Sequence, residues 1–501
     1  MRWLIFAVAV FVIGNLLVVS YWRDSQVNLS VTGILFYMLV LPLILIATSY
    51  AVVAIYKKIK QKPLSEQDSE QALAQTDNEQ TVQAALIQEL SGFKVYASAL
   101  QSSEGSDAQD IVDALKSFKA AELNPVLVGP DGVNIITRHI DLEEDELQNL
   151  VVLLSATGYD LAQEEPSFQR IVMLYQRLLE GLAFELSHLA QGLMQFNTWR
   201  HRPNFTDHLL HPAWVGTHTH TLEPDEKKEV TQLVAEMQQW PTELHVCYFL
   251  PERFSSEQQN LLSEYMSGAL VELGYARDTF TLNPYFTGQD ISQTEQIKQI
   301  VEKIKDAKQT VFLIMGADST IDQDYIEDIM WSDDSYKASE YGYAMLMSLE
   351  QVNIPELTPI NYVSYPLQVN VDSLVKNIQL TKDSITQNIK NFQTHKNIEL
   401  NEETHLVSNI HSIIDYKKLP LMNETAINLG IEADQILFST SLLEHNTYQA
   451  AGFAWVFAAS LSTDLFDAPQ VLCLSDQEQV LVWLMHDSNQ QQNDLTSSEA
   501  A

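Results

Sequence analysis

Two long apolar runs lie at the start of the chain. Residues 3–21 and 31–56 are almost wholly hydrophobic, and each can cross ~30 Å of hydrocarbon at ~1.5 Å per helical residue. The first run has no small-x-small cleavage site and a second run follows at once, so we expect a retained transmembrane hairpin over residues 1–62 rather than a signal peptide. Four lysines follow the second run, namely Lys57, Lys58, Lys60 and Lys62. The positive-inside rule then predicts that both termini are cytoplasmic.

The composition of the remainder predicts an acidic, folded body. The 501 residues include 66 Asp and Glu against 29 Lys and Arg, for a net charge of −37, and 46% are hydrophobic. This charge excludes a general nucleic-acid binder, because phosphates would be repelled. Residues 63–83 and 488–501 are polar and predict a flexible linker and a disordered tail. The soluble domain is therefore expected over residues 84–487, with halves at about 84–355 and 356–487.

Apolar runs alternate with helical patterns through this body, which predicts an α/β fold. Residues 94–100, 244–250 and 310–315 are expected as strands, the last one fully buried. Helices are expected over residues 108–121, 168–195, 256–273, 292–306 and 371–392, and Ser292 with Glu295 has the pattern of a capping box.

Two strand-like segments resemble each other. FKVYASALQSS at 93–103 is similar to INYVSYPLQVN at 360–370, and each precedes an expected helix. The pair suggests a duplicated α/β unit, although a chance match between two strands would give the same pattern.

Five weak motifs follow in a fixed order from about residue 290. They are a helix, the strand TVFLIMGAD with Gly316 and Asp318, the strand YGYAMLMSLE (341–350), the segment SNIHSII with Asn409 and His411, and TSLLEHNTYQAAGFAWVFAASL with His445 and Gly452. Together they resemble the C-terminal part of the thiolase superfamily, in particular the β-ketoacyl synthases. The resemblance implies duplicated α/β/α layers.

The same resemblance implies a catalytic centre that this chain lacks. The family places a nucleophilic cysteine just before the helix that precedes TVFLIMGAD, and this chain has GQDIS (288–292) there. Cys247 lies too early in the chain and Cys473 too late. Two cysteines also exclude a disulfide scaffold.

Other positions of the family pattern are changed as well. Thr440 stands at the family's lysine, and Ser412 and Glu444 replace glycines. Asn409, His411 and His445 are thus vestigial site candidates, with residual electrophilic catalysis by the histidines as the alternative to a structural role. No catalytic or cofactor-binding residue and no cofactor is expected.

Two further patterns can be interpreted either as a functional site or as ordinary solvent-exposed structure. His208, His211, His218 and His220 have spacings that could bind Zn²⁺, but the prolines around them favour an exposed polar loop, so no metal is expected. The acidic run DLEEDE (141–146) is typical of a solvated helix start. Its alternative role is a docking surface for a basic partner.

The combination predicts a non-catalytic membrane-anchored adaptor of the bacterial inner membrane that binds another protein. In architecture and in the stretch GFKVYASALQ…DIVDAL (92–115) the chain is similar to adaptors that load lipase effectors onto the type VI secretion system. The resemblance implies a secreted effector or secretion-machine component as partner, and a homodimer is possible because thiolase-like folds usually pair through their sheets. The alternative is a membrane-tethered acyltransferase or condensing enzyme acting on acyl thioesters.

Overall fold

The computed structural model describes most of the predicted soluble domain. The described ranges are 92–156, 160–200, 239–288, 292–331, 336–370, parts of 386–410, 419–443, 450–461, 468–475 and 479–487. The two predicted spans, the linker, the tail and most of the predicted helix 371–392 lie outside them. Within the described residues, no helix has the length and hydropathy that a membrane crossing requires.

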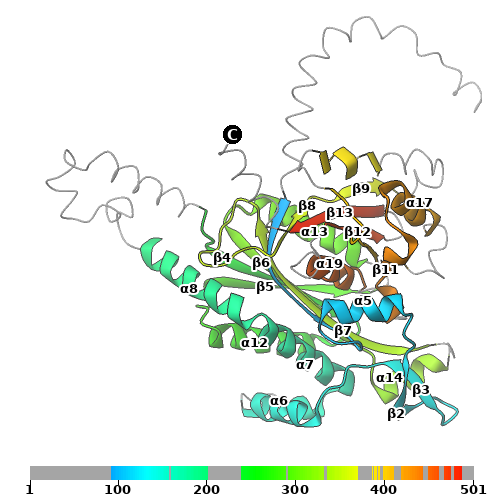
Figure 1. Ribbon diagram of the computed structural model, residues 1–501. Coiled ribbons are helices and arrows are strands. Elements are labelled where there is room, and N and C mark those ends of the chain that lie inside the picture. Colours follow the sequence, from blue (N-terminus) through cyan, green and yellow to red (C-terminus); the bar gives the residue numbers. More distant parts are fainter. Residues whose placement is uncertain are drawn as a thin grey trace, which may run out of the picture. The chain divides into compact units, whose positions relative to one another are not determined.

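A mixed 13-stranded sheet forms the centre of the domain (Figure 1). Its main path runs β11-β10-β12-β13-β8-β1-β7-β6-β4-β5. The first half of the chain contributes β1 (Gly92–Gln101), β4 (Glu243–Pro251), β5 (Phe280–Thr287), β6 (Thr310–Ser319) and β7 (Ala338–Leu349), together with a side hairpin of β2 (Glu122–Val128) and β3 (Asn134–Arg138). The second half contributes β8 (Asn361–Ser364), β9 (Leu367–Asn370), β10 (Leu406–Ser408), β11 (Ile436–Phe438), β12 (Gln470–Ser475) and β13 (Gln479–Asp487).

The two halves repeat one strand order. When the main-path strands of each half are numbered from one to five along the chain, both halves run 3-2-4-5-1 across the sheet. In both, the second strand is parallel to its two neighbours, and the fifth is antiparallel to the fourth and first. The similar segments 93–103 and 360–370 contain the first strand of each half, and these strands, β1 and β8, pair antiparallel. The expected α/β fold class is confirmed, and the repeated order is what a duplicated unit requires.

Helices cover both faces of the sheet. They are α5 (Ala108–Lys116), α6 (Glu144–Ala156), α7 (Pro166–Gly181), α8 (Ala183–Arg200), α12 (Ser256–Glu272), α13 (Gln293–Asp306), α14 (Gln323–Met330), α17 (Leu419–Leu429), α18 (Thr440–Leu443) and α19 (Ala450–Leu461), with short 3-10 turns at Leu161–Gln163 and Ala433–Gln435. In β7, Gly342 faces Leu178 of α7 and the next residue, Tyr343, faces Gly452 of α19. Because successive strand residues point to opposite faces, α7 and α19 lie on opposite sides of β7.

Two of the expected helices differ from the structure in length. The helix expected over 168–195 is divided at Leu182, where Gly181 approaches the Ala99 side chain of β1 so closely that an added Cβ would lie 3.3 Å from it. The helix expected over 108–121 ends earlier, at Lys116, because Ser117 caps it and Phe118 adopts a φ of 50°. That left-handed conformation does not continue a helix.

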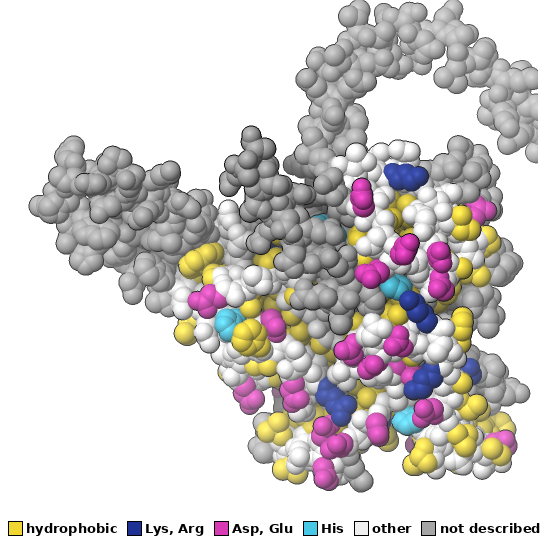
Figure 2. Space-filling view, in the orientation of Figure 1, with side chains coloured by type: hydrophobic (Ala, Val, Ile, Leu, Met, Phe, Trp, Pro, Cys, Tyr) yellow, Lys and Arg dark blue, Asp and Glu magenta, His cyan; other side chains and the backbone are white. Residues whose placement is uncertain are grey.

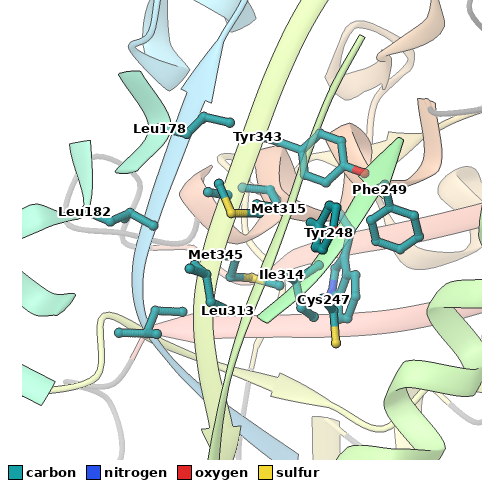
Figure 3. Packing of buried hydrophobic residues seen from close by; sticks show 14 of the residues in the cluster. Leu178, Leu182, Cys247, Tyr248, Phe249, Leu313, Ile314, Met315, Tyr343 and Met345 are labelled. Atoms are coloured by element: carbon teal, nitrogen blue, oxygen red, sulfur yellow. The ribbon is translucent and has the colours of Figure 1, made fainter. Parts of the chain in front are cut away.

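The core is built from both halves of the chain. All twelve residues of α19 are buried, as expected for a helix that is apolar on every side. It contacts β12 of its own half and β1, β7 and α13 of the other. Figure 3 shows part of this core, where Cys247, Phe249, Met315 and Tyr343 come from β4, β6 and β7.

Candidate functional site

Helix α13, the helix that precedes the strand TVFLIMGAD, packs against α19. Ser292 caps α13, its Oγ accepting a hydrogen bond from the backbone N–H of Glu295 at 3.2 Å. This confirms the Ser292 half of the predicted capping box. Gln293, the first residue of α13, directly follows the segment 288–292 and is buried at 1% exposure.

The amide of Gln293 has a partner at both ends. Its Nε2 donates to the Tyr343 hydroxyl at 2.5 Å, and its Oε1 accepts from the backbone N–H of Gly452 at 2.7 Å. Gly452 is the third described residue of α19, and its N–H donates to Gln293 instead of pairing only within the helix. Gln293 therefore connects α13, β7 and the beginning of α19.

The ring of Tyr343 fills the space between two glycines. A Cβ added to Gly316 of β6 or to Gly452 of α19 would overlap the Tyr343 phenol. The ring is fully buried, and its centroid lies 6.4 Å from that of Phe249 (Figure 3). Burial raises the pKa of Tyr343 well above its usual value, so the phenol stays neutral and protonated. The Tyr343 ring thus occupies the space between Gly316 and Gly452, next to Gln293.

Both thiols are buried in strands rather than placed at a helix N-terminus. Cys247 on β4 and Cys473 on β12 are 2% and 1% exposed. Burial raises the pKa of Cys247 to about 12 and raises the pKa of Cys473 as well. Since the thiolate is the nucleophile, neither side chain is reactive near neutral pH.

Asn409 and Thr440 hold the ends of neighbouring elements together. The Nδ2 of Asn409 donates to the Ser475 carbonyl at 3.0 Å, and its Oδ1 accepts from the Ser475 N–H at 2.7 Å. Thr440 donates to the Ile410 carbonyl at 3.0 Å. These contacts join the end of β10 to β12 and to α18.

The remaining site candidates lie outside the described residues. They are His411, His445, Ser412, Glu444, His208, His211, His218 and His220. Among the residues that the structure does describe, no group of three or more His, Cys, Asp or Glu side chains could hold a metal ion.

A second buried polar cluster, which the sequence analysis did not identify, lies at the end of β6. The carboxylate of Glu340 has no exposed side-chain surface; it accepts from Arg170 Nε at 2.7 Å, Arg170 Nη2 at 2.5 Å, Ser319 Oγ at 2.9 Å and the Ile140 N–H at 2.5 Å. Beside it, Arg253 pairs with Asp318 at 2.5 Å.

This cluster, Arg170–Glu340–Ser319 with Arg253–Asp318, is internally paired. The Asp318 carboxylate raises the pKa of Arg253 against the opposing effect of its burial. Each carboxylate already has a cationic partner, so the arrangement ties α7, β6, β7 and the segment after β4 together. The signal for it in the sequence is a charged residue, Glu340, at the start of a strand whose twelve residues are all buried.

Comparisons with known proteins give only distant likenesses. No protein-family model matches the chain, and no curated protein matches it. Among solved structures, the ishigamide ketosynthase/chain length factor has 11% sequence identity and a TM-score of 0.44, over 79% of this chain and 99% of that one. Cerulenin-bound OleA of Xanthomonas campestris has 7% identity and a TM-score of 0.34, over 79% and 97%. The 3-oxoacyl-[acyl-carrier-protein] synthase III of Aquifex aeolicus has 12% identity and a TM-score of 0.30, over 52% and 81%. These low scores carry no residue role, reaction or partner over to the chain.

Proposed function

We propose that the chain is a non-catalytic, membrane-anchored adaptor whose thiolase-like body binds another protein. The observation that carries this proposal is Gln293, which stands at the N-terminus of α13 with both ends of its buried amide already bonded, to Tyr343 and to Gly452. An amide is neither a nucleophile nor a base at neutral pH, and here both its Nε2 and its Oε1 already have a partner within the protein.

The thiolase-like part of the proposal is supported by the chain itself. The strand order is the same in both halves, and the five sequence motifs follow in the expected order. Loss of the nucleophile removes most of the rate of an acyl transfer. The protonated, buried thiols Cys247 and Cys473 offer no replacement.

An acyl-transfer assay tests the absence of catalysis. The full-length chain is incubated with an acyl-CoA, and both the release of free CoA and the intact protein mass are followed. We expect no CoA release above the protein-free blank and no acyl adduct. An adduct, or a release that Cys247→Ser or Cys473→Ser abolishes, would establish the alternative, a tethered acyltransferase or condensing enzyme.

The variant Gln293→Cys tests two reasons for inactivity separately, namely the missing nucleophile and the space filled by Tyr343. It places a thiol at the N-terminus of α13, where a helix dipole would lower its pKa. We expect no turnover from this variant, because Tyr343 still occupies the space between Gly316 and Gly452. Turnover by Gln293→Cys alone would contradict a closed centre.

The anchor and the partner complete the proposal. The apolar runs 3–21 and 31–56 and the lysines after them support two spans in a bacterial inner membrane with the body in the cytoplasm. The similarity to lipase adaptors supports an effector of the type VI secretion system as the partner.

Carbonate extraction and protease protection test the anchor, and affinity purification with mass spectrometry tests the partner. Recovery of acyl carrier protein alone would contradict the adaptor role.

A further inference from the structure

A surface groove lies between three helices of the first half. It encloses about 610 Å³ and is lined by residues of α6, α7 and α12, by the first residue of α8 and by the segment that follows α12. Its volume is within the ~300–1,000 Å³ that binding pockets commonly have. Leu153, Leu154, Leu179, Ala269 and Leu273 give it an apolar lining.

Helix α6 presents apolar side chains beyond those that it buries. Leu150 and Leu154 are 2% and 4% exposed, but the neighbouring Val152 and Leu153 are 67% and 52% exposed. Leu153 belongs to the groove lining. Figure 2 shows hydrophobic and acidic side chains close together at the lower edge of the visible face, where Figure 1 places α6. Apolar surface of this kind, rimmed by polar residues, is typical of an interaction site.

The rim of the groove is negatively charged. Glu180 of α7 and Glu264 and Glu272 of α12 line it, and all three residues are exposed. Burial raises the pKa of the Tyr265 phenol between them, and the charges of Glu180 and Glu272 raise it further. Arg277 is the one cation among the described lining residues.

The walls of the groove favour a helix as the occupant. They are helices, so the lining offers no strand edge to which an extended peptide could add. Ala183, Gly268 and Ala269 are small and allow another backbone to approach closely. A Cβ added at Gly268 would meet no atom within 4 Å, so the space above α12 is open.

We propose that this groove binds an amphipathic helix of a partner protein, apolar on one face and rich in Lys and Arg along its flanks. The apolar face covers Leu153, Leu179 and Leu273, and the flanking cations face Glu180, Glu264 and Glu272. This is the helix-in-groove mode of recognition. The inference rests on the proposed adaptor role and names the chemistry of the bound partner.

Two synthetic peptides of equal length and equal leucine face test the proposal. One carries lysine on its polar face and the other carries glutamate, and both bear a photoreactive group. Each is titrated against the full-length chain by fluorescence anisotropy, with the buffer and its detergent as the blank. We expect the lysine peptide to bind at least about tenfold more tightly than the glutamate peptide, and to cross-link to α6 and α12.

A matched pair of glycine variants distinguishes peptide binding in the groove from nonspecific electrostatic binding to an acidic protein. Gly268→Leu fills the open space on α12, whereas Gly192→Leu adds the same side chain on α8, outside the lining, where a Cβ also meets nothing within 4 Å. Both replace a helical glycine, so both should fold. We expect Gly268→Leu to weaken the lysine peptide about tenfold and Gly192→Leu to leave it unchanged.

The outcomes are distinct from those of the adaptor test. Equal affinity of the lysine peptide for both glycine variants, or cross-links outside α6, α7 and α12, would overturn the groove proposal while leaving the acyl-transfer result untouched. Acyl transfer with intact groove binding would overturn the non-catalytic role instead. The triple variant Glu180→Lys/Glu264→Lys/Glu272→Lys should reverse the preference between the two peptides.

Discussion

At the residue scale, the centre of the domain depends on a tyrosine between two glycines. Gly316 and Gly452 belong to motifs that the family resemblance singled out, and both are needed here because the Tyr343 ring occupies the space of their missing Cβ atoms. Gln293 fixes the phenol through its hydroxyl. Here the two small residues make room for a side chain of the same protein.

Gly452→Ala should therefore destabilise the fold. The added methyl overlaps a ring that is buried on all sides, and overpacking of this kind costs about 1–3 kcal/mol. Gly192→Ala is the matched control in α8; with open space above it, this change should stabilise by about 0.5–1 kcal/mol. The free energy of unfolding in urea measures both. A neutral Gly452→Ala would mean that Tyr343 moves freely.

His405 makes a second residue-scale prediction, on pH. Burial, with a smaller contribution from Lys116, lowers the pKa of His405 to about 4. The unfolded chain binds this proton near pH 6.5, and the folded chain only near pH 4. Stability is thus lost as pH falls between these values, by at most about 1.4 kcal/mol per unit. His405→Gln should flatten this acid limb relative to the parent chain in urea unfolding between pH 7 and 4. Parallel curves would contradict the burial of a neutral imidazole.

At the element scale, helix α7 makes two arginine–glutamate pairs in opposite environments. Arg170 pairs with Glu340, whose side chain has no exposed surface, and Arg177 pairs with Glu146, whose side chain is 46% exposed. Both pairs have an N···O distance of 2.5 Å. The two pairs differ in the solvent exposure of the glutamate side chain. A comparison of the two therefore shows how burial changes the contribution of an ion pair to stability.

Glu340→Gln should cost about 3–5 kcal/mol, because Arg170 loses its countercharge inside the protein. Glu146→Gln should cost less than about 1 kcal/mol, because water solvates the Arg177 guanidinium that has lost its partner at the surface. Thermal and urea unfolding of both variants provide the measurement. Equal losses of stability in the two variants would show that water also solvates the charges of the cluster at the end of β6.

The elements themselves were predictable where the signal is local. The strand over TVFLIMGAD follows from its unbroken apolar run, and the start of α13 follows from Ser292. The division between α7 and α8 at Leu182 was not predicted, because the apolar helical spacing continues across it. The hairpin of β2 and β3 was missed too, since its exposed Leu123, Val126 and Val133 give no inward-facing alternation.

At the scale of the whole molecule, the repeat was visible in the sequence and its central contact was not. The segments 93–103 and 360–370 contain the paired strands β1 and β8, whose residues lie side by side. The contact that closes the centre joins Gln293 to Gly452, 159 residues further along the chain. No periodicity or motif connects positions that far apart, so only the folded chain identifies Gln293 and Tyr343 as a unit.

The shared core predicts how the two halves unfold. Helix α19 of the second half packs on β1, β7 and α13 of the first, and one hydrophobic cluster includes Phe93, Tyr343 and Trp483. Neither half can bury its apolar surface alone, so the body should unfold in one transition, followed alike by tryptophan fluorescence and circular dichroism. Residues 356–487 expressed alone should remain unfolded, and co-expression with the rest of the chain should restore the transition. Two separate transitions, or a folded isolated half, would show that α19 adds little to the first half.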